Sequence, residues 1–478
     1  MVYSDPATRQ YVGSPTILVL PGGGLLASHD RFPLDSRLAA PLSSASSAAP
    51  AAKSASTVEV WPCSAASVFL SNSSDGATWQ PLSTAPGQYW SSPFLLGGAW
   101  PAGAFVWPPP RGLGRQSPPS SAALATQKHR PYCHSPLPPL CMSALCPAAG
   151  ALYLLGTTSS EPGASVSVSR SGDGGATWAQ QAAVLAPPRG CSFASGSVPT
   201  LLAGSWVYRG VELYCGALRW PQSYQAVVIY ASQYSDLLDP ASWAATPPAP
   251  FRSEWIPAWM PGPVVSGGYL EGNAVEGRDG RVLLLLRCRV YDAAARIYDL
   301  QHACLLRLEG SVARRNASLA WRGFVSMPGG GNKFSVKFDE GSGQYLALTN
   351  PSVDRYGANA DARNILVLAH SPNLIDWRVA ATLLRPAPGA PWDASLWGES
   401  YQYADWATQG GDLLAVVRTS TDGADSFHNS NRCEACGRAG VESGAGGRGR
   451  GKTAPELLPS GPPPAGLLQN NFQALEGL

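Results

Sequence analysis

The chain has 478 residues, with 34 Lys or Arg against 32 Asp or Glu, and a formal net charge of +2. Charged residues make up only 14% of the sequence, so neither a nucleic-acid partner nor an anionic membrane is indicated. The longest apolar runs, such as residues 282–286, are too short to cross a bilayer. The first ten residues show no signal-peptide pattern, and the localisation stays open.

Composition and pattern together favour an all-β protein. The chain is rich in turn formers, with 51 Gly and 44 Pro, and it carries 16 Trp. Residues 14–29 predict a β-hairpin around Pro21-Gly22-Gly23-Gly24. Residues 150–156 form a clear strand pattern. Further strand runs are residues 201–208, 211–218, 226–230, 281–290, 303–308, 333–338, 344–348, 365–370 and 412–418.

Three stretches depart from this pattern. Residues 39–55 and 96–149 are low-complexity segments rich in Ala, Ser and Pro, and we interpret both as insertions. Residues 432–478 are rich in Gly and Pro and predict a disordered or misread tail. No closing strand is evident after Arg432, so the sequence leaves open a domain that is incomplete at its C-terminal end.

Two segments share one turn pattern, Ser171-Gly-Asp173-Gly-Gly-Ala-Thr-Trp178 and the shorter Ser73-Ser-Asp75-Gly-Ala-Thr-Trp79. In such a turn the Asp carboxylate accepts backbone N–H groups, glycine tolerates positive φ, and Trp begins the return strand. Two degenerate copies follow, at residues 235–243 and 371–377.

This pattern resembles the Asp box, or bacterial neuraminidase repeat, of the sialidase-like β-propellers. The resemblance covers most of residues 11–95 and 150–431, and it is greatest to uncharacterised members of that family. It implies an all-β fold, a six-bladed β-propeller of the sialidase type over residues 11–431. An Asp box by itself identifies the scaffold and not a reaction.

The resemblance also implies a chemistry. Sialidase-like hydrolases use a Tyr nucleophile polarised by a Glu, an Asp acid/base and three Arg that hold a substrate carboxylate. The segment from Glu271 to Arg287 resembles the family's Glu–strand–turn–strand–Arg unit. An antiparallel hairpin would bring both ends to one edge of a blade. Glu271 is then the Tyr partner and Arg287 a carboxylate ligand. An ordinary hairpin with a surface Glu and a strand-end Arg is the alternative.

The other catalytic candidates follow from the same resemblance. In Tyr401-Gln-Tyr403, Tyr403 is the predicted nucleophile and Tyr401 the alternate. A tyrosine with a pKa near 10 needs a neighbouring base to attack at neutral pH. Asp30 is the predicted acid/base and requires a raised pKa. An Asp that caps a turn beside a solvent-exposed Arg is the alternative. The predicted substrate-binding residues are His29, Arg31, Arg287, Lys333, Tyr401, Arg418 and His428.

One departure weakens the match to sialidases. The family's first clamp Arg stands two residues before a Pro, but the position two before Pro15 is Gly13. Despite this departure, the resemblance implies a glycoside hydrolase of the sialidase superfamily that acts on a carbohydrate, without a metal or other cofactor. The lone Cys433-x-x-Cys436 pair is not read as a zinc site. A non-catalytic glycan-binding propeller and a structural propeller are the alternatives, and the oligomeric state stays open.

Overall fold

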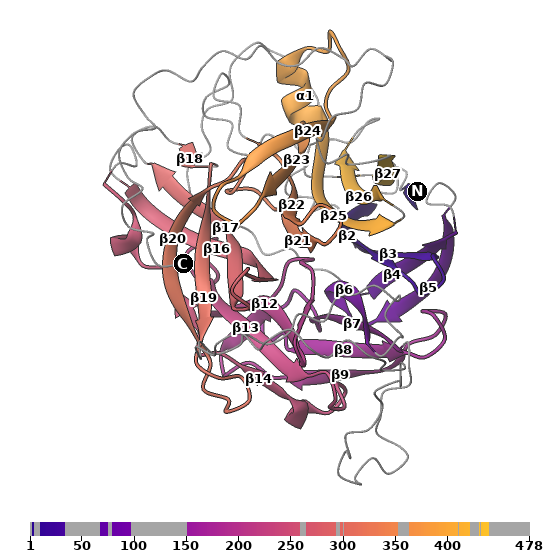
Figure 1. Cartoon of the computed structure of the whole chain (residues 1–478), viewed down its shortest axis with the longest axis vertical. Coiled ribbons are helices and arrows are strands. Elements are labelled where there is room, and N and C mark those ends of the chain that lie inside the picture. Colours follow the sequence, from indigo (N-terminus) through magenta and orange to yellow (C-terminus); the bar gives the residue numbers. More distant parts are fainter. Residues whose placement is uncertain are drawn as a thin grey trace, which may run out of the picture. The chain divides into compact units, whose positions relative to one another are not determined.

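Nearly all the regular structure in this computed structural model is β-strand (Figure 1). Among the residues that the structure describes, the exceptions are one short helix, α1 (Trp392–Gly398), and the 3-10 turns η2 (Pro240–Ser242) and η3 (Ser253–Trp255). The chain divides into two compact units, Met1–Val441 and Glu442–Leu478. The structure describes only part of the first unit: residues 2–3, 10–33, 67–74, 79–96, 151–258, 264–292, 297–299, 301–351, 363–409, 411–420, 430 and 432–438.

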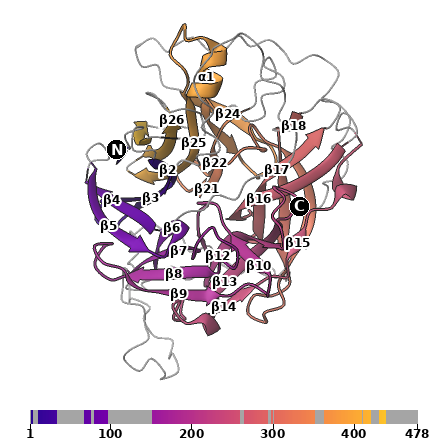
Figure 2. The same ribbon diagram turned by 180° about the vertical axis from the view of Figure 1, so that it is seen from behind.

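The strands form six antiparallel sheets, which follow one another in chain order (Figures 1 and 2). The first sheet is β2 (Gln10–Val19), β3 (Leu25–Pro33), β4 (Ser67–Ser73) and β5 (Gln80–Pro86). The second is β6 (Tyr89–Leu96), β7 (Ala151–Thr157), β8 (Val166–Ser171) and β9 (Ala179–Leu185). The third is β10 (Cys191–Ala194), β12 (Trp206–Cys215), β13 (Gln225–Ser232) and β14 (Trp243–Ala245), with β11 (Leu201–Ala203) and β15 (Ala249–Pro250) beside it.

Three further sheets of this all-β propeller follow along the chain. The fourth is β16 (Val264–Glu276), β17 (Val282–Asp292), β19 (His302–Glu309) and β20 (Ser318–Ser326), with β18 (Ile297–Asp299) on β17. The fifth is β21 (Ser335–Asp339), β22 (Gln344–Thr349), β23 (Leu366–Ser371) and β24 (Arg378–Leu384). The sixth is β25 (Ser400–Gln409), β26 (Asp412–Ser420), β27 (Arg432–Arg438) and β1 (Val2–Tyr3).

The core lies between consecutive sheets rather than at one centre. On β17, Leu284 packs in a cluster with Val228 of the third sheet, whereas Leu285 packs in a cluster with Tyr345 of the fifth. Successive side chains of a strand point to opposite faces, so a strand covered on both faces is apolar throughout. This explains why residues 282–286 form an unbroken apolar run. No helix in the described part of the chain is long and apolar enough to span a membrane.

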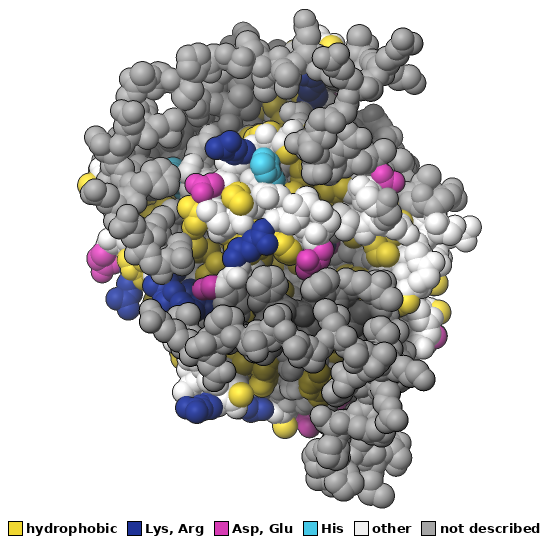
Figure 3. All heavy atoms as spheres, viewed as in Figure 1, with side chains coloured by type: hydrophobic (Ala, Val, Ile, Leu, Met, Phe, Trp, Pro, Cys, Tyr) yellow, Lys and Arg dark blue, Asp and Glu magenta, His cyan; other side chains and the backbone are white. Residues whose placement is uncertain are grey.

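Polar side chains join the innermost strands of neighbouring sheets. Asn273 of β16 accepts the backbone N–H of Val336 in β21 at 3.1 Å. Asp405 of β25 accepts the backbone N–H of Ile17 in β2, also at 3.1 Å. The second bond links the sixth sheet to the first, so the run of sheets closes on itself. On the described part of one face, cationic and anionic side chains are interspersed (Figure 3).

The turn after β8 has the geometry that its sequence predicts. Asp173 accepts hydrogen bonds from the Thr177 backbone N–H (2.9 Å) and hydroxyl (2.5 Å) and from the Ser171 hydroxyl (2.7 Å). These bonds, the one from the Thr177 hydroxyl above all, lower the pKa of Asp173 to about 2. The Trp178 indole donates to the hydroxyl of Ser83 in the first sheet at 3.2 Å. The turn therefore ties the second sheet to the first.

The other predicted copies occupy the same place, between the third and fourth strands of a sheet. In two of them the indole donates to a leucine carbonyl at 2.9 Å, Trp243 to Leu237 and Trp377 to Leu374. Residues 75–78 of the remaining copy lie outside the described residues, as does the predicted insertion at 39–55. Of the predicted insertion at 96–149, only the first residue is described, and it ends β6.

The sequence interpretation of the C-terminal end needs a correction. The sequence pattern places residues 432–438 in the tail. In the structure they form β27, which pairs with β26 on one side and with β1 on the other. The last strand and the first strand of the chain thus lie in one sheet. Periodicity missed β27 because a strand is defined by backbone pairing, and its sequence, Arg-Cys-Glu-Ala-Cys-Gly-Arg, has no apolar alternation. Residues 439–478 lie outside the described residues.

Asp405→Ala tests the closure of the ring. The buried Asp405 carboxylate also accepts the hydroxyl of Ser335 at 2.7 Å and pairs with Lys337 at 2.8 Å. Its loss leaves buried donors without an acceptor, so we expect the free energy of unfolding to fall by about 3–5 kcal/mol. Urea denaturation measures the change. Asp279→Ala, which removes an exposed surface ion pair, should cost less than about 1 kcal/mol; equal costs for the two variants would contradict this role.

Candidate active site

Four innermost strands carry the same irregularity. The pairing register shifts within β2, β6, β16 and β25. In each shift a residue other than glycine has positive φ: Ser14 (47°), Trp90 (49°), Glu271 (57°) and Tyr403 (51°). β-Bulges of this kind re-aim side chains and are common beside active sites. A non-glycine residue in this conformation costs roughly 1 kcal/mol or more, so the surrounding structure must hold it there.

Two of these bulges bring the predicted nucleophile to its predicted partner. The Tyr403 hydroxyl donates to Oε1 of Glu271 at 3.0 Å. The other carboxylate oxygen of Glu271 accepts Nη1 of Arg287 at 3.1 Å. The side chains of Glu271 and Arg287 are only 9% and 3% exposed. The carboxylate is therefore held on both oxygens, with the phenol on one side and the guanidinium on the other.

Glu271 is held in its charged form. Burial by itself would raise the pKa of this carboxyl, but the charges of Arg287 and Lys333 and the hydrogen bonds from Arg287 and Tyr403 outweigh burial. The pKa therefore lies below its usual value. A carboxylate in this state can accept the phenolic proton of Tyr403 when the oxygen attacks an electrophile.

Cationic groups surround the Tyr403 ring. The Arg418 and Arg363 guanidinium carbons lie 5.2 and 5.6 Å from the ring centroid, and the Lys333 ammonium nitrogen lies 6.0 Å from it. Burial lowers the pKa of Lys333 to about 8, although the charge of Glu271 acts in the opposite direction. Together with Arg287, this places four cationic side chains around one phenol–carboxylate pair.

Asp30 lies on the first sheet and contacts the second. Its Oδ1 accepts the backbone N–H of Trp90 at 3.3 Å, and its Oδ2 is buried with no hydrogen-bond partner among the described residues. Burial raises its pKa well above the usual value, against the opposing hydrogen bond from Trp90 and the charges of Arg418 and Arg209. Asp30 and Tyr403 thus share Arg418 as a neighbour. The raised pKa favours the protonated form of this carboxyl.

Gly13 pairs directly with Asp30 across β2 and β3. Residues opposite one another in an antiparallel pair project from the same face. An arginine at position 13 would therefore lie beside Asp30. The chain has no side chain there, so any clamp must use other arginines.

The other predicted substrate-binding residues occupy different environments. His29 is adjacent to Asp30 on β3 and therefore points to the opposite face, where its ring stacks on Phe69 at 5.5 Å. The Tyr401 hydroxyl donates to Glu399 at 3.4 Å and not to Glu271. The side chain of Arg31 lies outside the described residues, and so does all of His428.

Three site residues escaped the sequence analysis. Arg209 donates through Nη2 to the Trp90 carbonyl at 2.9 Å. Glu212 accepts the backbone N–H of Gly272 at 3.2 Å, and burial raises its pKa to about 8, with the charge of Glu271 acting in the same direction. Arg209 and Glu212 are charged residues within the otherwise apolar strand β12. That pattern could have identified them as site candidates, because charged residues are seldom buried unless they are paired. Arg363 precedes a strand and gave no such signal.

No family model and no curated protein sequence matches the chain. Solved structures that are similar to it include an α-L-arabinanase of Penicillium chrysogenum complexed with arabinobiose (11% identity, TM-score 0.46, 91% of this chain and 94% of that one). Another is an intramolecular trans-sialidase from Ruminococcus gnavus (11% identity, TM-score 0.47, 91% and 96%). A third is a leech intramolecular trans-sialidase (11% identity, TM-score 0.47, 92% and 69%). All three TM-scores are below 0.5, so these likenesses carry no information about the chemistry of this chain.

Arg287→Ala tests the ion pair at the centre of the site. It leaves the Glu271 carboxylate buried without its guanidinium, so we expect the free energy of unfolding to fall by about 3–5 kcal/mol at neutral pH. Chemical denaturation measures this loss. Arg281→Ala is the matched control, because Arg281 pairs with Asp279 at 3.5 Å on the exposed surface and should contribute less than about 1 kcal/mol. A native-like stability for Arg287→Ala would show that Glu271 is not held as a buried anion.

Proposed function

We propose that this protein is a glycoside hydrolase of the sialidase type in which Tyr403 is the nucleophile. The observation that carries the proposal is the 3.0 Å hydrogen bond from the Tyr403 hydroxyl to a buried carboxylate, Glu271, which is itself fixed by Arg287. Phenols are weak nucleophiles near neutral pH, and an adjacent base is the usual means of activation.

The proposed reaction has two steps. In the first, the Tyr403 oxygen bonds to the anomeric carbon and its proton passes to Glu271. The bond to the leaving oxygen breaks, and Asp30 donates a proton to that oxygen. In the second step water attacks the anomeric carbon, Asp30 takes the water proton, and Tyr403 leaves as its oxygen regains the proton from Glu271. The unpartnered Oδ2 of Asp30 supports its assignment as the proton donor.

The charge around the site favours a sugar that carries a carboxylate. Arg287, Lys333, Arg363 and Arg418 surround the Tyr403–Glu271 pair, and such an excess of positive charge attracts an anion. Guanidinium groups suit a carboxylate because they offer paired N–H donors in one plane. In this proposal Arg363 and Arg418 compensate for the absent side chain at Gly13.

The scaffold proposal follows the same line. We interpret the six sheets as the six blades of a sialidase-type propeller, with β1 as the outer strand of the last blade. The hydrogen-bonded turn at Asp173 and the related turns at Trp243 and Trp377 are then Asp boxes. Their common position between third and fourth strands supports this interpretation.

Tyr403→Phe tests the nucleophile. It removes only the attacking oxygen, so we expect kcat on 4-methylumbelliferyl α-N-acetylneuraminide to fall at least about a hundredfold. A fluorimetric assay measures the rate. A second substrate, 4-nitrophenyl α-L-arabinofuranoside, has no carboxylate, and we expect the native protein to cleave it more slowly.

Tyr401→Phe is the matched control, because that phenol lies two residues away and donates to Glu399. It should keep a native rate. A native rate in Tyr403→Phe, measured on protein with a cooperative thermal melt, would refute the nucleophile. Absence of hydrolysis by the native protein on both substrates would refute the enzyme proposal for these sugars.

The pH profile tests Asp30. Activity requires Glu271 ionised and Asp30 protonated, and the pKa of Glu271 is lowered while that of Asp30 is raised. We therefore expect a bell-shaped profile of kcat/KM whose acid limb follows the lowered pKa of Glu271 and whose alkaline limb follows the raised pKa of Asp30.

Asp30→Asn should abolish the alkaline limb. The loss of rate should be large for an alkyl glycoside and small for a 4-nitrophenyl glycoside, whose leaving group needs no proton. Because the pKa of Asp30 is raised by folding, its ionisation opposes folding as the pH rises, so the variant should be at least as stable as the native protein at neutral pH. Equal losses on both substrates would argue against Asp30 as the acid.

A further inference from the structure

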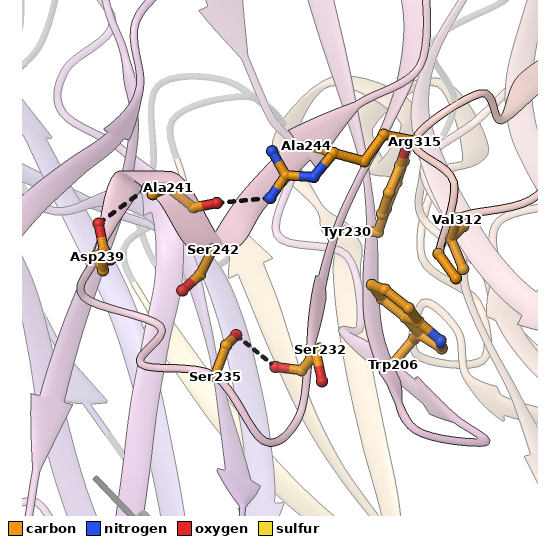
Figure 4. Close-up of a pocket in the computed structure, with 11 residues that line it drawn as sticks. Trp206, Tyr230, Ser232, Ser235, Asp239, Ala241, Ser242, Ala244, Val312 and Arg315 are labelled. Atoms are coloured by element: carbon orange, nitrogen blue, oxygen red, sulfur yellow. Dashed lines mark hydrogen bonds between the residues drawn. The ribbon is translucent and has the colours of Figure 1, made fainter.

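A second concave site lies far along the strands from Tyr403. It is a pocket of about 330 Å³ at the edge between the third and fourth sheets (Figure 4). That volume falls within the range of small-molecule sites. Its walls come from the ends of β12 and β13, the β13–β14 loop with η2, and the β19–β20 loop. The residues that the argument uses are Trp206, Tyr230, Ser235, Asp239 and Arg315.

The positions of two residues on strand β12 give the distance between this pocket and the candidate active site. Glu212 of β12 contacts the backbone beside Glu271, whereas Trp206 begins the strand and lines the pocket. Six residues separate Glu212 from Trp206, which corresponds to roughly 20 Å along an extended strand. The pocket is therefore distinct from the site of Tyr403.

The pocket exists because the turn between β13 and β14 is longer than the corresponding turn between β23 and β24. Ten residues (233–242) connect β13 to β14, but only six (372–377) connect β23 to β24. Both turns keep the same anchor, a tryptophan indole that donates to a leucine carbonyl at 2.9 Å. The additional residues form η2, whose Ala241 carbonyl accepts Nη2 of Arg315 from the neighbouring sheet at 2.6 Å. The Arg315 side chain spans the gap and closes one side of the pocket (Figure 4).

The chemistry of the walls suits a neutral polyol. The partly exposed Trp206 ring supplies an apolar surface. It packs edge to face on the buried Tyr230 ring, with centroids 6.1 Å apart. Ser235 and other serine hydroxyls stand opposite them. Asp239 and Arg315 carry opposite charges, so the walls favour neither an anion nor a cation. Alternating C–H faces and hydroxyls are what a saccharide ring presents to such a surface.

One polar atom in the wall has no partner. The Tyr230 side chain is 1% exposed, and its hydroxyl makes no hydrogen bond to any described residue. In Figure 4 the Tyr230 ring lies between Trp206 and Arg315. A buried hydroxyl without a partner costs about 1–3 kcal/mol. A ligand hydroxyl that reaches past Arg315 would remove that cost.

We infer that this pocket is a second carbohydrate site, which binds one or two rings of a neutral saccharide. It does no chemistry, because it has no nucleophile beside a base. Its role is to hold a glycan at the edge of two sheets while the candidate active site remains free. The inference rests on the pocket alone and does not depend on the proposed hydrolase activity.

The experiment measures binding to the full chain carrying Tyr403→Phe, so that turnover at the candidate active site cannot consume the probe. The probes are maltose, cellobiose, lactose and arabinobiose, detected by saturation-transfer NMR and titrated by calorimetry. We expect at least one of them to bind. Tyr230→Phe, added to this background, should weaken binding about fivefold, the loss of roughly 1 kcal/mol of hydrogen bonding. It should leave the thermal melt unchanged or raised, because the orphan hydroxyl is gone.

Ser235→Trp fills the pocket and should abolish binding. Both pocket variants, made in the otherwise native chain, should leave the hydrolysis rate at the candidate active site unchanged. The inference is overturned if none of the four probes binds, or if the bound probe is unaffected by both pocket variants. Loss of hydrolysis in Tyr403→Phe with intact saccharide binding would separate this site from the proposed function.

Discussion

Apolar clusters join each of the first five described sheets to the next one along the chain, and that constraint organises the rest of the molecule. A sheet whose two faces are both apolar must be covered on both sides. Here the covering is done by other sheets, as Leu284 and Leu285 illustrate on β17 by packing into clusters with opposite neighbours. In a row of sheets covered in this way, the first and the last sheet each keep one uncovered face unless they also pack on one another. The bond from Ile17 to Asp405 and the pairing of β27 with β1 make that closure.

Closure brings the innermost strands together, and this is where polar chemistry is concentrated. Asn273 and Asp405 each accept a backbone N–H of the next sheet. Two residues before each of them along the chain, a bulge places Glu271 or Tyr403 in a left-handed conformation. The local cost of that conformation is offset by the packing and the hydrogen bonds on both sides. The same architectural device thus links the sheets and aims the functional side chains.

The electrostatics of the two sites differ in kind. At the candidate active site, the charges of Arg287 and Lys333 outweigh burial and lower the pKa of Glu271. Burial raises the pKa of Asp30 and of Glu212. The walls of the outer pocket combine opposite charges with aromatic rings and hydroxyls. A reacting centre needs groups whose protonation states differ, and a site that only binds a neutral ligand does not.

Features that depend on residues close together in the chain could be predicted from the sequence. Strand runs, the hydrogen-bonded turn at Asp173, and the hairpin that places Leu270 opposite Arg287 all follow from local pattern, because turn chemistry and pairing register are short-range. The tertiary structure decided the rest. Tyr403 meets Glu271 across 132 residues of chain, and Arg363, Arg209 and Glu212 join them only because the sheets close. β27 could not be predicted from the sequence, because it is a strand through its backbone pairing with β26 and β1 and has no side-chain periodicity.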